Sequence, residues 1–147
     1  MRTLQEILLA PDTQPRVIDD CMTLIQQEVS ELSGISGAAT KVAYKAVISF
    51  APDHVRYTVE TKLPQMVSVL EPYWADFGRS GGGEFGDYLA KHSDEVSNAL
   101  LSITDASAAS PSAGAVVVKA YRAVRGHAAK NVSAALPRVG ALVQSYA

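Results

Sequence analysis

The chain has 147 residues, of which 48% are hydrophobic and 19% are charged. This composition is typical of one domain with a packed core and excludes a disordered chain. The net charge of −2 and the lack of any basic run argue against a nucleic-acid partner. One cysteine excludes an internal disulfide, and no apolar run approaches the roughly 20 residues of a membrane span. We therefore expect a single domain over residues 1–147, located in the cytoplasm.

The sequence begins with the pattern of a short helix followed by a longer one. Thr3 and Glu6 form a capping-box pattern, and Pro11 ends the helix that they begin. Pro15 then lies in the first turn of a second helix that runs to Gly34. The second helix has one apolar face, with residues three or four positions apart: Ile18, Cys21, Met22, Ile25, Val29 and Leu32.

A third helix is expected from Ser36 to the turn at Pro52. Its inward face should carry small and apolar residues: Ala39, Val42, Ala43, Ala46, Val47 and Phe50. We then expect one helix up to Pro64 and another from Pro64 to residue 77, bent at Pro72, because proline lacks the N–H that continues a helix.

After three consecutive glycines, the second half repeats the order of a short helix and then longer ones. The short helix covers residues 85–91, and Ser93 caps the next. Beyond a loop-like stretch at residues 106–114, one helix should end at Gly126, and a last one should run over residues 127–146, bent or split at Pro137. No stretch alternates with period two between hairpin turns, so we predict an all-α domain of about eight helices.

The two halves resemble each other and indicate an internal duplication. Residues 43–47 read AYKAV and residues 120–124 read AYRAV, an offset of 77. The Leu-Pro pairs at residues 63–64 and 136–137 follow at an offset of 73, and this drift of four residues is about one helical turn. Weaker matches upstream pair residues 4–8 with 85–89 and residues 17–24 with 96–103. We expect similar halves over about residues 1–78 and 84–147, joined at residues 77–84.

The central stretch, residues 73–88, reads YWADFGRSGGGEFGDY and holds the only tryptophan. Together with LEPYWADF, FGDYLA and the later LPRVGAL, it is similar to an uncharacterised family of small, all-helical bacterial proteins. The resemblance covers essentially the whole chain and implies an all-helical fold. It implies no activity, so no catalytic residue is carried over.

The aromatic residues of this stretch are the first candidates for a binding site. They either close the core where the two halves meet or line a pocket for a small apolar ligand. The prolines at 64, 72 and 137 could open space between helices for such a pocket. The candidates are Tyr73, Trp74, Phe77, Phe85 and Tyr88.

His54 and His127 form the second candidate, because they are separated by the same 73 residues as the Leu-Pro pairs. We expect each at the start of a helix, where the dipole favours a neutral imidazole that can act as a base or a ligand. The alternative interpretation is a pair of ordinary polar residues at helix starts.

Other reactive residue types carry weaker signals. His92, Asp94 and Glu95 lack the i, i+4 spacing of a helical zinc site and fit a helix cap. Cys21 lies on an apolar face without a neighbouring His or cation, which is typical of a buried small residue. We therefore predict no metal and no cofactor.

Three hypotheses for function follow from the sequence. The first is a non-catalytic interaction or assembly protein with a protein partner or a homo-oligomer, since tandem helical units often present paired surfaces. The second is a carrier or sensor of a small apolar ligand between the halves. The third is an enzyme that uses His54 and His127. Of these we favour the first, and an enzyme is the least supported.

Overall fold

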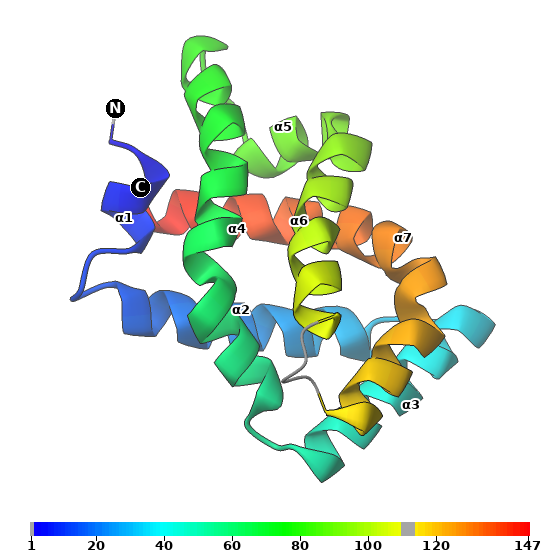
Figure 1. The fold of residues 1–147 in the computed structure, drawn as a ribbon. Coiled ribbons are helices and arrows are strands. Elements are labelled where there is room, and N and C mark those ends of the chain that lie inside the picture. Colours follow the sequence, from blue (N-terminus) through cyan, green and yellow to red (C-terminus); the bar gives the residue numbers. More distant parts are fainter. Residues whose placement is uncertain (1, 110–113) are drawn as a thin grey trace.

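Helices and the short turns between them make up the computed structural model, which describes residues 2–109 and 114–147 (Figure 1). No strand occurs in these residues, so the predicted all-α single domain is confirmed. The seven helices of the described residues are α1 (Leu4–Leu8), α2 (Gln14–Ser30), α3 (Gly34–Phe50), α4 (His54–Arg79), α5 (Phe85–Lys91), α6 (Ser93–Ala108) and α7 (Ala115–Tyr146).

The prolines do not divide the long helices as expected. α4 continues through Pro64 and Pro72, and α7 continues through Pro137. All three prolines are exposed, so each ring faces solvent rather than the packed side of its helix. Gly126 likewise lies inside α7 rather than at its end. These two long helices account for the smaller number of helices than the sequence predicted.

The hydrophobic core is one cluster to which every helix except α3 contributes buried residues, within the described part of the chain. Its largest fully buried side chain is Phe85 at the start of α5. α2 and the second half of α7 run side by side beneath α4 (Figure 1). The buried cluster is Leu4, Ile7, Leu8, Val17, Ile18, Val59, Leu63, Val67, Leu70, Trp74, Phe77, Phe85, Leu89, Val96, Leu136 and Val143.

The two halves pack their helices in the same scheme. α1 and α2 both pack on α4, as α5 and α6 both pack on α7. Five of the residue pairs aligned by the sequence repeat are buried in both halves, whereas others, such as Met22 and Leu101, are buried in only one: the five are Leu4 and Phe85, Leu8 and Leu89, Val17 and Val96, Leu63 and Leu136, and Leu70 and Val143.

A side chain from each long helix caps the short helix packed on it. The carboxylate of Glu71 in α4 accepts hydrogen bonds from the backbone N–H groups of Leu4 (3.0 Å) and Gln5 (2.9 Å) at the start of α1. In the second half, the amide oxygen of Gln144 in α7 accepts one from the N–H of Phe85 (2.7 Å) at the start of α5. Each cap satisfies N–H groups that a helix leaves without partners. Glu71 and Gln144 are related by the offset of 73.

Two tyrosines connect each half to the other. Tyr73 in α4 donates a hydrogen bond to Glu95 of α6 (3.3 Å), and the ring of Tyr146 in α7 lies under the guanidinium of Arg16 in α2 (5.9 Å). Residues 73 and 146 are partners in the repeat, and so are residues 16 and 95 at the offset of 79. The internal duplication stays a prediction from the sequence, which these paired contacts support.

The halves differ in one element. In the first half the chain turns at residues 51–53 between α3 and α4, whereas the corresponding part of the second half is uninterrupted in α7. The offset between matched residues changes from 77 to 73 between residues 47 and 63, and this turn lies within that interval. As a result, the first half presents α3 as a separate helix, which packs along the beginning of α7 at the edge of the molecule (Figure 1).

Candidate functional site

The central aromatic residues pack against one another at the junction of α4 and α5. The Trp74 and Phe85 rings meet edge to face with centroids 5.0 Å apart, and the Phe77 and Phe85 centroids are 5.2 Å apart. The Trp74 indole N–H donates to the backbone oxygen of Arg2 (3.1 Å), so its polar group is satisfied as well. These contacts fit the interpretation in which the aromatics close the core.

Tyr73 and Tyr88 flank this cluster and approach His92. The ring centroids of Tyr88 and His92 are 4.8 Å apart, and those of Tyr73 and His92 are 5.8 Å apart. Partial burial raises the pKa of both tyrosines, and the neighbouring Glu95 raises that of Tyr73 further. Both phenols are therefore neutral hydrogen-bonding groups at neutral pH. Their role in binding a ligand stays a prediction.

His54 is far from the aromatic cluster, and His127 does not begin a helix. His54 begins α4, as expected, but Trp74 lies 20 residues further along the same helix, a separation of about 30 Å. His127 was expected to begin a helix and instead lies exposed inside α7, because that helix starts at Ala115. The helix-start environment that motivated a neutral His127 is therefore missing.

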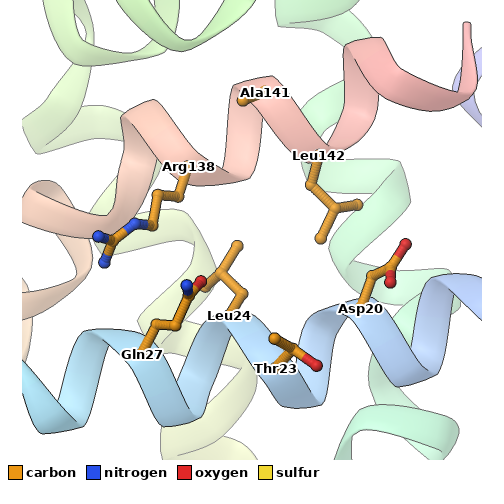
Figure 2. A pocket seen from close by; sticks show the side chains of 7 residues that line it. All are labelled: Asp20, Thr23, Leu24, Gln27, Arg138, Ala141 and Leu142. Atoms are coloured by element: carbon orange, nitrogen blue, oxygen red, sulfur yellow. The ribbon is translucent and has the colours of Figure 1, made fainter.

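Two open hollows lie on the surface of the described residues, and the arginine in each is paired with acidic residues. The first, of about 230 Å³, lies between α2 and α7 (Figure 2), where Arg138 forms ion pairs with Glu28 (2.9 Å) and Glu31. The second, of about 260 Å³, contains Arg125 bound to Asp105 (2.8 Å). Pockets for drug-sized ligands usually enclose about 300–1,000 Å³. Both hollows are smaller, and neither guanidinium is free to bind an anion.

Burial raises the pKa of the Cys21 thiol to about 11, and the nearby Asp20 adds to this shift. The thiolate, which is the nucleophilic form, is therefore scarce at neutral pH. Among residues 2–109 and 114–147, no group of three His, Cys, Asp or Glu side chains is placed to hold a metal ion. Over the same residues, no helix is both long and apolar enough to cross a membrane.

α3 carries three large apolar side chains that are exposed to solvent. Ile35, Val42 and Phe50 are exposed to 93%, 68% and 73%, and Ala39 and Ala46 between them are also exposed. At 100° per residue, these five positions fall within about 80° of the helix circumference. They form one apolar stripe, which we call the outer face of α3.

The sequence prediction for this helix was wrong on four residues. Ala39, Val42, Ala46 and Phe50 were assigned to the inward face, but they lie on the outer face of α3. Val47 and Gly37 are the buried positions of the helix, the latter against the backbone of Leu32. α3 is apolar on more than one side, so its periodicity could not distinguish the packed side from the exposed one.

A comparison within the repeat could have revealed the exposed face. At the offset of 77, Val42 in α3 corresponds to Lys119 in α7, and both are exposed. α7 therefore carries a charged residue, as solvated helix faces usually do, at the position where α3 carries valine.

The whole chain was also compared with protein families, curated proteins and solved structures. It matches a family described as a family of unknown function, DUF6918, over residues 4–147. The chain belongs to this family. The DUF6918 match starts at the first residue of α1 and includes all seven helices, so α3 and its outer face are part of the family domain. No curated protein and no solved structure matches the chain.

Proposed function

We propose that this DUF6918 protein is a non-catalytic interaction protein that binds a protein partner through the outer face of α3. The observation that carries the proposal is the exposure of Ile35, Val42 and Phe50 on one side of a single helix. Large apolar side chains that gather on one surface are typical of protein–protein interaction sites, whereas isolated ones are ordinary. Tyr57, on the first turn of α4 just after α3, is exposed as well.

The position of α3 in the fold supports this proposal. The helix adds no residue to the buried cluster of the described chain, and packing accounts for its inner side, where Val47 is buried, but not for its apolar outer face. Its other side packs along α7, where Asn131 donates a weak hydrogen bond to Thr40 (3.5 Å). α7 thus holds α3 in place and leaves its outer face accessible to a partner.

Photo-crosslinking at one residue tests the proposal. A photoreactive phenylalanine derivative would replace Val42 in one variant and Lys119 in a matched control, each expressed in the native host and irradiated in living cells. We expect a discrete crosslinked product from position 42, identifiable by mass spectrometry, and none from position 119. Equal products from both positions, or none from position 42, would contradict the proposal.

A further inference from the structure

The outer face of α3 has a residue pattern that suits contact with a second copy of the same face. Along the helix it reads large, small, large, small, large, in the order Ile35, Ala39, Val42, Ala46 and Phe50. The order of large and small side chains is the same in both directions, and the spacing about Val42 differs by one residue between the two sides. A surface of this kind is self-complementary about a twofold axis, as the interface of a symmetric dimer must be.

Two such faces can pack closely when the helices are antiparallel. With Val42 at the crossing point, Ala39 of one copy faces the region of Ala46 of the other, and these small side chains let the two helices approach closely. The exposed Lys45 and Ser49 border the apolar stripe and would form the polar rim of such an interface. The net charge of −2 leaves little repulsion between two copies.

The accessible surface of the chain is larger than that of a compact monomer. It amounts to 8247 Å², whereas a 15.6 kDa globular monomer is expected to expose about 7,200 Å². The excess of about 1,000 Å² is comparable to the roughly 800 Å² that each partner buries in a standard protein–protein interface. The chain as a whole therefore exposes enough surface for an interface of standard size, and the apolar outer face of α3 is the part of the described surface that suits one.

We infer that the partner bound by the outer face of α3 is a second copy of this chain, in an antiparallel α3–α3 dimer with Val42 on the twofold axis. This inference rests on the proposed function, since it assigns the occupant of the same surface. It also accounts for the lysine at residue 119 of α7, which corresponds to Val42 at the offset of 77. Residue 119 would lie outside the dimer contact and would stay in contact with water.

Light scattering coupled to size-exclusion chromatography tests the inference over a dilution series of the full-length chain. We expect the wild type at twice the chain mass of 15.6 kDa, Val42→Lys at the mass of one chain, and the control Lys119→Ala at the wild-type mass. Because Val42 is exposed, Val42→Lys should have the same helical circular dichroism spectrum as the wild type. Its thermal midpoint should equal that of the wild type at a dilution where the dimer has dissociated.

Two results would overturn the dimer. One is a wild type that is monomeric at every concentration, and the other is a mass that Val42→Lys leaves unchanged. A monomeric wild type whose position 42 still crosslinks to a different protein would overturn only the identity of the partner. A monomer without any crosslink would overturn the interaction function as well.

Discussion

Gly86 and Gly140 allow α5 and α7 to touch backbone to backbone. A Cβ built on Gly140 would overlap the backbone nitrogen and Cα of Gly86, and one on Gly86 would lie 2.5 Å from the carbonyl oxygen of Pro137. The obstacles are main-chain atoms, so no side chain can rotate away to make room. At these two positions glycine is required by space.

We therefore expect Gly140→Ala to lower the free energy of unfolding by about 3 kcal/mol or more, because α5 must move away from α7. The matched control is Gly126→Ala in the same helix, where a Cβ meets no atom within 4 Å. This control should raise the free energy of unfolding by about 0.5–1 kcal/mol, since alanine is the better helix former. Urea unfolding of both variants measures the difference, and similar effects at the two positions would contradict the close contact.

At the scale of the helices, the caps on α1 and α5 come from residues distant in sequence. No local motif marks Glu71 or Gln144 as a capping residue, because each lies near the C-terminal end of a long helix and reaches a different helix. The capping box at Thr3 was visible from spacing alone, and the Thr3 hydroxyl does accept from the N–H of Glu6 (3.2 Å). Sequence patterns therefore identify caps made within a helix and miss those made between helices.

We predict that Glu71→Ala lowers the free energy of unfolding by about 1–2 kcal/mol, because it removes the acceptor for two N–H groups at a helix start. Gln144→Ala should cost about 1 kcal/mol, since it removes one such bond at the second short helix. Glu71→Gln is the control, because it keeps one acceptor oxygen without the charge and should cost less than Glu71→Ala. Urea unfolding checks the order, and an unchanged stability in Glu71→Ala would show that the cap contributes nothing.

The helices differ in how well their periodicity predicts them. The predicted apolar stripe of α2 faces the rest of the protein, with Ile18 buried and its later members half-buried, and Val17, which the stripe did not include, is buried as well. α4 and α7 were predicted as broken helices because proline is a strong local signal, yet its effect depends on whether water can reach the freed carbonyl. For α3 the prediction took part of the outer face as the inward face because the helix is apolar on more than one side.

The candidate site was predicted less well than the fold for a related reason. The aromatic residues around Trp74 attracted attention by their rarity, and the structure shows them packed with Phe85 in the core. The outer face of α3 consists of common residues such as Val42, whose meaning depends on their exposure. Exposure is a property of the tertiary structure, so sequence periodicity alone could not identify this surface.

At the scale of the whole molecule, six helices form a shared core and α3 lies against its edge. The paired caps and paired tyrosine contacts are consistent with two equivalent halves around that core. The turn at residues 51–53 is where the halves differ, and it separates α3 from α4. In our account, this turn gives the first half a helix that can pair with a second chain.

Disulfide trapping at the proposed twofold axis tests this account most directly. Val42→Cys would be made in a Cys21→Ala background and oxidised under mild conditions, with Lys119→Cys in the same background as the control. Two cysteines join only when their Cα atoms come within about 7 Å, a distance reached at position 42 by residues on the axis of an antiparallel α3 pair. We predict a covalent dimer from position 42 and none from position 119. A position-42 variant that stays monomeric after oxidation, or equal crosslinking at both positions, would contradict the account.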